Sequence, residues 1–277
     1  NYERYGAPYE YGGRYFYSHN TGLQNQSVIY VSSNVDQAGR VLLDPNTLSE
    51  DGTVSLSEIA PSDDGSLLVY GTSTGGSDWQ EFRIRNVDTG KDLEDVIRWV
   101  KFSGASWAKD GSGFFYSCYD EPEAGDALKG KNEFQKLFFH KIGTAQSADT
   151  LVYERKDHAD WGFGGHVTDD GRYLIIHVSQ GTDPKNRVFY KDLSEQDSKV
   201  VELLTEADAD YGFAANDGPV FFFQTNLDAP RYRVIAIDTR EPERAKWREV
   251  IPQTADKLEQ ASFVGGKVFC EYLKDAR

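Results

Sequence analysis

A tight-turn glycine followed by a strand-like run recurs six times along the 277-residue chain. The fourth copy is typical: Asp169-Asp170-Gly171 precedes an apolar run at 173–178, and a polar loop leads to a second run at 188–190. Glycine accepts the positive φ that such turns demand, and aspartate can bond its own backbone. The runs have strand length and are rich in β-branched and aromatic residues. Each copy therefore predicts three strands of a four-stranded antiparallel meander.

The spacing of these turns predicts the fold class. Successive turn glycines lie 46 to 60 residues apart, and they are Gly13, Gly65, Gly111, Gly171, Gly218 and Gly266. Repeats of about 40–50 residues with several strands each are typical of propeller blades. One blade cannot bury both of its faces, so neighbouring blades must stack. We therefore expect an all-β protein, a β-propeller of four-stranded antiparallel blades, with five complete repeats and part of a sixth forming one domain over residues 1–277.

Two further expectations concern the elements and the extent of the chain. Only 241–247 and 93–96 have an apolar spacing that also fits a helix. The chain begins at Asn1, contains no methionine and stops within the sixth repeat. Because a propeller closes on itself, we expect the domain to be incomplete at its C-terminal end and the chain to be an interior piece of a longer protein.

Composition excludes several classes of protein. Hydrophobic residues make up 39% of the chain and aromatics 13%, which is enough for a substantial core. A net charge of −15 argues against nucleic acid as a partner, since phosphate binding needs clustered lysine and arginine. No apolar stretch approaches the ~18 residues of a membrane span, so no membrane association is expected. Cys118 and Cys270 lie in apolar runs and are predicted to be buried free thiols.

No stretch of the sequence forms a complete active site. Ser77 is the nearest match to a hydrolase nucleophile, but it lacks the trailing glycine and the helix of that motif. The five histidines show no zinc-ligand spacing, so neither a metal nor another cofactor is expected. His140 and His177 lie in strand-like runs and are interpreted as ordinary core or strand-surface residues. The paired acids at 63–64 and 169–170 are interpreted as turn residues.

Several segments, in order along essentially the whole chain, resemble the propeller of the prolyl oligopeptidase family. The combination is more specific than any single motif. The segments are 12–17, 20–27, 43–46, 49–54, 76–79, 100–103, 170–173 and 183–187.

The resemblance implies a cytoplasmic or periplasmic serine peptidase that cleaves short peptides after proline. In that family an α/β-hydrolase domain carries the Ser-Asp-His triad, and a seven-bladed propeller covers it as a lid. This chain would supply the lid, which gates access and helps to line the substrate cavity, and would have no catalytic residue of its own. Its partners would be short proline-containing peptides and the α/β-hydrolase domain of the same protein, which lies outside this chain.

The resemblance also implies roles for individual residues. Phe102 matches a phenylalanine that lines the third substrate subsite, where a flat apolar wall gains contact area. Thr182 falls where some relatives place a cysteine near that subsite, and Phe163 is expected to supply an apolar contact there. Asp78 matches an interface aspartate that pairs with a substrate-binding arginine of the hydrolase domain. The long loop at 120–134 corresponds to the interface loop that gates access, and it contains Asp120, Glu133 and Phe134.

The sequence leaves two other functions open. A stand-alone propeller could act as a protein-binding scaffold in the manner of WD40 repeats, although the Gly-His and Trp-Asp signatures of those repeats do not recur here. A propeller enzyme with a central metal or carboxylate site would need inward-facing acids from several blades. The sequence does not identify which side chains line the centre.

Overall fold

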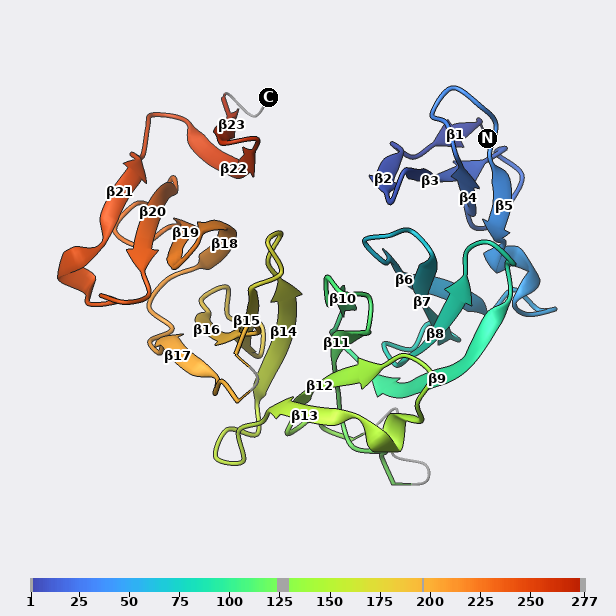
Figure 1. Cartoon of the computed structure of the whole chain (residues 1–277), viewed down its shortest axis with the longest axis horizontal. Coiled ribbons are helices and arrows are strands. Elements are labelled where there is room, and N and C mark those ends of the chain that lie inside the picture. The colour runs from blue at the N-terminus through green and yellow to red at the C-terminus, as the bar shows by residue number, and fades with distance from the viewer. Residues whose placement is uncertain (1, 124–129, 196, 275–277) are drawn as a thin grey trace. The chain divides into compact units, whose positions relative to one another are not determined.

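The computed structural model describes residues 2–123, 130–195 and 197–274. Over these residues the chain forms 23 β-strands and three short 3-10 helices (Figure 1). It divides into two compact units, residues 1–159 and 160–277, and the division falls between the third and fourth sequence repeats. The all-β prediction is confirmed.

The first repeat of the first unit forms one antiparallel sheet. Its central strand, β3, pairs with β1, β2 and β4, and β5 lies at the outer edge. The elements are β1 (Arg4–Tyr5), β2 (Tyr9–Tyr11), β3 (Arg14–Asn20), β4 (Val28–Ser32), β5 (Arg40–Leu43) and the 3-10 helix η1 (Pro45–Thr47).

The second and third repeats of the same unit share one eight-stranded sheet. Each repeat contributes four strands, and the two halves meet where Val100 at the end of β9 pairs with Cys118 at the end of β11. The second repeat contains β6 (Val54–Pro61), β7 (Leu67–Thr74), β8 (Gln80–Asn86) and β9 (Asp92–Val100). The third contains β10 (Ser106–Trp107), β11 (Gly113–Cys118), β12 (Lys136–Lys141), β13 (Thr150–Tyr153) and the 3-10 helix η2 (Gln146–Ala148).

The second unit contains two four-stranded sheets and a two-stranded one, all antiparallel and in chain order. The fourth repeat contains β14 (Trp161–Val167), β15 (Tyr173–Gln180), β16 (Arg187–Asp192) and β17 (Val201–Leu204). The fifth contains β18 (Tyr211–Asp217), β19 (Val220–Thr225), β20 (Arg233–Asp238), the 3-10 helix η3 (Arg244–Lys246) and β21 (Arg248–Ile251). The sixth contains β22 (Lys257–Val264) and β23 (Lys267–Leu273).

Successive repeats pack against each other within each unit, as predicted. In the first unit, Phe16 and Val31 of the first repeat join Leu68 and Val87 of the second in one buried cluster. A second cluster unites the second and third repeats, and it includes Val69, Phe82, Ile97, Trp107 and Phe114. In the second unit, a cluster across the fourth and fifth repeats includes Tyr173, Ile175, Val188, Phe221 and Phe223. Apolar faces that one sheet leaves uncovered are therefore buried by its neighbour.

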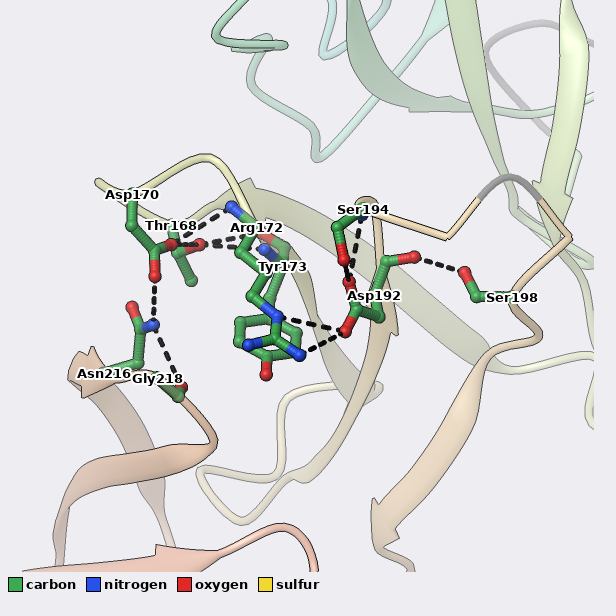
Figure 2. Close-up of polar contacts among 9 residues, drawn as sticks. All are labelled: Thr168, Asp170, Arg172, Tyr173, Asp192, Ser194, Ser198, Asn216 and Gly218. Atoms are coloured by element: carbon green, nitrogen blue, oxygen red, sulfur yellow. Dashed lines mark hydrogen bonds and ion pairs between the residues drawn. The ribbon is translucent and has the colours of Figure 1, made fainter.

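The predicted turn chemistry is also confirmed. All six turn glycines have positive φ, between +52° and +74°. In the fourth repeat, Asp170 Oδ1 accepts hydrogen bonds from Thr168 Oγ1 at 2.6 Å and from the Arg172 backbone N–H at 3.1 Å (Figure 2). Its other oxygen accepts one at 2.7 Å from Asn216 of the next repeat. The turn aspartate therefore both closes its own hairpin and ties two repeats together.

The remaining predictions about elements have mixed outcomes. Residues 93–96 belong to strand β9, so a helical interpretation there is wrong, whereas 241–247 contains η3. Both cysteines are free thiols as predicted, Cys118 buried and Cys270 half-buried. Within the described ranges, no helix combines the length and apolar character needed to cross a membrane.

Candidate functional site

Phe102 lies in the irregular segment that follows β9 and presents its ring to solvent. Its side chain is 64% exposed, although most large apolar side chains of the unit are buried. Its φ of +54° lies in the left-handed region, which costs a non-glycine residue about 1–2 kcal/mol. Neither the backbone conformation nor the exposure of Phe102 stabilises the fold by itself. The surrounding residues must impose both features.

The residues on either side of Phe102 fasten this segment to the sheet. The carbonyl of Lys101 accepts a hydrogen bond at 2.7 Å from Nε2 of Gln135, a side chain that is 1% exposed. Ser103 Oγ accepts one at 2.8 Å from the backbone N–H of Ser117 in β11. The loop is therefore held from both sides, and the Phe102 ring projects from a fixed base.

The ammonium group of Lys101 lies at the centre of the candidate site. Lys101 is buried, and its Nζ lies 5.0 Å from the ring centroid of Trp79 and 5.2 Å from that of Phe102. These distances suit cation–π attraction. The same Nζ lies 3.6 Å from Oδ2 of Asp78, whose side chain is 67% exposed. The structure therefore brings the predicted residues Asp78 and Phe102 together around a lysine.

Asp78 and its neighbours lie in the hairpin loop between β7 and β8. Ser77 Oγ accepts a hydrogen bond at 3.1 Å from the Trp79 backbone N–H. This loop leads into a strand, so Ser77 has the hairpin position expected from the sequence and not that of a nucleophile at a strand-to-helix turn. Trp79 packs edge-on against Trp99 and Tyr119, with ring centroids 5.7 and 5.9 Å apart. An aromatic cluster therefore supports the loop.

A surface pocket of about 510 Å³ opens beside this aromatic cluster. Its floor combines indole rings with hydroxyl groups and with the Glu81–Arg98 ion pair, whose closest atoms are 3.3 Å apart. The lining residues are Thr72, Thr74, Ser77, Trp79, Gln80, Glu81, Arg98 and Trp99.

The predicted interface loop is described at its two ends, and residues 124–129 lie outside the described residues. Asp120 forms an ion pair with Lys136, with an Nζ–Oδ1 distance of 2.6 Å. Glu133 is exposed. Phe134 is 42% exposed, has a φ of +61° and donates its backbone N–H to the carbonyl of Ala159. The gating role of the loop stays a prediction.

Thr182 and Phe163 belong to the second unit. Thr182 is exposed in the hairpin loop between β15 and β16. Phe163 lies in β14 opposite Val178 of β15 and is only 2% exposed, so its ring offers almost no free surface in this structure. Their subsite roles stay predictions.

His140 is a buried core residue and His177 is exposed on β15, so each fits one of the two predicted environments. The surroundings of His140 are charged. Nδ1 lies 2.7 Å from Asp149 Oδ1, and Nε2 lies 3.0 Å from Asp95 Oδ1; all three side chains are buried. Burial disfavours the imidazolium, yet the hydrogen bonds to both carboxylates outweigh it and raise the pKa of His140. Tyr116 Oη donates to Asp149 Oδ2 at 2.7 Å, which leaves the cluster well bonded and closed to ligands. Across the described ranges, no group of three or more His, Cys, Asp or Glu residues could hold a metal ion.

Reasoning from the sequence missed the roles of Lys101 and Gln135. Lys101 immediately precedes Phe102, and Gln135 immediately follows Phe134, so both stand beside predicted residues. Their contacts, however, join positions 23 and 34 residues apart. A local pattern carries no signal for such contacts, because they depend on how the strands pair.

The relatives found by comparison with known proteins agree with the family that the sequence resembles. A family model described as "Prolyl oligopeptidase, N-terminal beta-propeller domain" matches residues 1–277. The chain is 39% identical to a prolyl endopeptidase of Elizabethkingia meningoseptica, covering 100% of this chain and 38% of that protein. It is 35% identical to prolyl oligopeptidase A of Amanita bisporigera, covering 91% of this chain and 37% of that protein.

A solved structure supports the same relationship. Prolyl oligopeptidase B from Galerina marginata, bound to a 35mer hydrolysis and macrocyclization substrate, superposes with a TM-score of 0.91 at 29% identity. The match covers 99% of this chain and 41% of that one. The chain thus spans about two-fifths of the length of the relatives that it matches.

Proposed function

The chain belongs to the prolyl oligopeptidase family as an N-terminal β-propeller domain, and we propose that it is the propeller lid of a serine-type prolyl endopeptidase. In this proposal an α/β-hydrolase domain of the same protein carries the catalytic triad. The propeller admits short proline-containing peptides and supplies part of the wall of the substrate cavity. The relatives' names and the match over the whole chain support the proposal.

The observation that carries the subsite assignment is the exposed, strained Phe102. A phenylalanine with 64% exposure and a left-handed backbone is costly to maintain, yet Gln135 and Ser117 hold its segment in place. A flat apolar ring fixed in this way gains contact area when a peptide side chain covers it. We assign Phe102 to the wall that contacts the substrate residue two positions before the proline.

The proposal gives the other predicted residues supporting roles. Asp78 presents an exposed carboxylate that suits bidentate pairing with an arginine of the hydrolase domain. Asp120, Glu133 and Phe134, at the described ends of the 120–134 segment, face that domain in this proposal. Thr182 is exposed in the second unit, and its contact to the substrate is part of the proposal. Phe163 is buried within the second unit, and its apolar contact to the substrate stays a prediction.

The proposal is tested by Phe102→Ala in the two-domain protein. We expect kcat/KM for an extended substrate with an apolar residue two positions before proline to fall about 10- to 30-fold, which corresponds to the 1.5–2 kcal/mol of one buried aromatic contact. A minimal Gly-Pro substrate does not reach that wall, so its kcat/KM should change less than about 2-fold.

The matched control is Leu23→Ala, which removes another exposed apolar side chain of the first unit. Leu23→Ala should change kcat/KM for neither substrate. An equal loss of both substrates in Phe102→Ala would contradict the subsite assignment. Failure of the unmodified two-domain protein to cleave after proline would contradict the proposed function as a whole.

A further inference from the structure

Lys101 has an unusual environment for a lysine of the first unit. Its side chain is 11% exposed, while the nearest carboxylate, on Asp78, is 3.6 Å away and largely in solvent. A surface ion pair of this length contributes little. The ammonium is therefore stabilised by a combination of one carboxylate and the faces of two aromatic rings, those of Trp79 and Phe102.

Each of these contacts reaches a different part of the candidate site. Trp79 belongs to the β7–β8 loop and to its aromatic cluster. Phe102 belongs to the segment after β9 and is exposed toward the proposed substrate. Asp78 is exposed toward the proposed partner domain. One buried cation thus contacts the supporting loop, the substrate wall and the interface acid.

From this arrangement we infer that Lys101 is a positioning residue that sets the orientation of the Phe102 ring and couples it to the Asp78 carboxylate. This inference rests on the proposed function and extends it to substrate preference. The ammonium lies within cation–π distance of both rings, so its attraction to the Phe102 face restrains that ring although most of its surface is in water. The Asp78 charge holds the ammonium toward the loop, so neutralising that charge loosens the restraint on the ring.

The first test replaces Lys101 by methionine, which keeps the length of the side chain and removes its charge. In the two-domain protein, Lys101→Met should raise KM for the extended substrate about 5- to 10-fold, as expected from losing a largely desolvated cation–π contact. The effect on the minimal Gly-Pro substrate should be clearly smaller. Lys101→Arg should recover most of the loss, because a guanidinium also pairs with carboxylates and stacks on aromatic faces.

The control is Lys109→Met. Lys109 belongs to the same unit and pairs with Asp63 at 2.9 Å, but it lies in a turn between β10 and β11. The Lys109→Met variant should leave the ratio of kcat/KM for the extended substrate to kcat/KM for the minimal substrate unchanged. Equal losses for both substrates in Lys101→Met, or an arginine variant as impaired as the methionine variant, would overturn the inference.

A second test does not depend on Lys101→Met retaining wild-type stability. Asp78 is exposed, so Asp78→Asn should fold normally. This variant should lower the extended-to-minimal ratio of kcat/KM about 2- to 3-fold when Lys101 is present, and should leave the ratio unchanged in the Lys101→Met background. Interacting residues show such non-additivity, whereas independent ones do not. A ratio that Asp78→Asn leaves unchanged when Lys101 is present, or lowers equally in both backgrounds, would overturn the coupling.

The outcome for Phe102→Ala distinguishes a failure of the role inferred for Lys101 from a failure of the subsite assignment. If Phe102→Ala impairs the extended substrate more than the minimal one and Lys101→Met does not, only the role of Lys101 is overturned. If Phe102→Ala also fails to discriminate, the subsite assignment itself is wrong.

Discussion

Gly12 and Gly13 stand side by side in the first turn, but their surroundings differ. Both have positive φ, +56° and +74°. A Cβ on Gly12 would lie 1.9 Å from the carbonyl oxygen of Asp64 in the turn of the next repeat, whereas a Cβ on Gly13 would have no heavy atom within 4 Å. Gly12 therefore permits a close approach of two repeats, and Gly13 satisfies only the local turn.

This difference predicts unequal costs for the two alanine substitutions. Gly13→Ala should lower the free energy of unfolding by about 1–2 kcal/mol, the cost of a left-handed alanine. Gly12→Ala should cost about 3 kcal/mol or more, because the neighbouring backbone must also move. Denaturant unfolding of the two variants would measure both values. Equal costs would show that the contact with Asp64 does not constrain the turn.

At the scale of single residues, the sequence predicts those features that depend only on residues adjacent in the chain. The six turn glycines, and the aspartates that precede four of them, follow from local backbone chemistry; the positive φ of all six glycines confirms the turns. The left-handed φ of Phe102 and the burial of Lys101 were not predictable in this way. Both result from tertiary partners, because Gln135 and Asp78 reach this segment from other strands and loops.

Among the elements, the inner strands were predictable and the outer strands were not. β15 combines an apolar run with a preceding glycine turn, and the structure places it over the predicted run at 173–178. The outermost strands β13 and β17 have four residues each and are half exposed, so their residues show no clear alternation. Pairing with the preceding strand, rather than local preference, makes them strands.

The buried His140 cluster joins elements and gives a prediction about stability. Asp95 comes from β9, His140 from β12, and Asp149 from the turn between η2 and β13. Asp149→Asn removes one partner of a buried charged group and should lower the free energy of unfolding by about 3–5 kcal/mol. Lys109→Met breaks an exposed pair and should cost about 1 kcal/mol or less. Similar losses in thermal unfolding experiments would argue against a charged cluster.

The same cluster should make stability depend on pH. The pKa of His140 is raised in the folded state, so folding favours its protonated form. Its contribution is fully present below the unfolded-state pKa of about 6.5 and is lost as the pH rises through the folded-state value. The difference in unfolding free energy between the wild type and His140→Gln should therefore shrink as the pH rises above about 6.5. A difference that grows with pH would contradict this assignment of charge.

For the whole molecule, the repeat spacing predicts the fold class, and the ordered segments point to the family to which the chain belongs. The organisation into two compact units was not predictable, because the turn spacing is similar on both sides of residue 159.

The chain by itself should not hydrolyse a chromogenic Gly-Pro substrate. Its nearest candidate nucleophile, Ser77, lies in a hairpin loop and its Oγ accepts a backbone hydrogen bond from Trp79. The two-domain protein should cleave the same substrate. Turnover by the chain alone that disappears in Ser77→Ala would contradict the assignment of catalysis to another domain.

The pairing of Val100 with two repeats has a mechanical consequence. Val100 pairs with Gln80 of its own repeat and with Cys118 of the next, and Lys101 and Phe102 follow it directly. The segment is therefore anchored at a seam, and only Lys101 separates the seam from Phe102. Any sliding of the second repeat against the third would be transmitted to Phe102 as a displacement of its ring. A peptide bound on that ring would in turn restrain the two repeats at the seam. It would slow hydrogen exchange at the Tyr119 amide, which donates across the seam to the carbonyl of Trp99 at 3.0 Å.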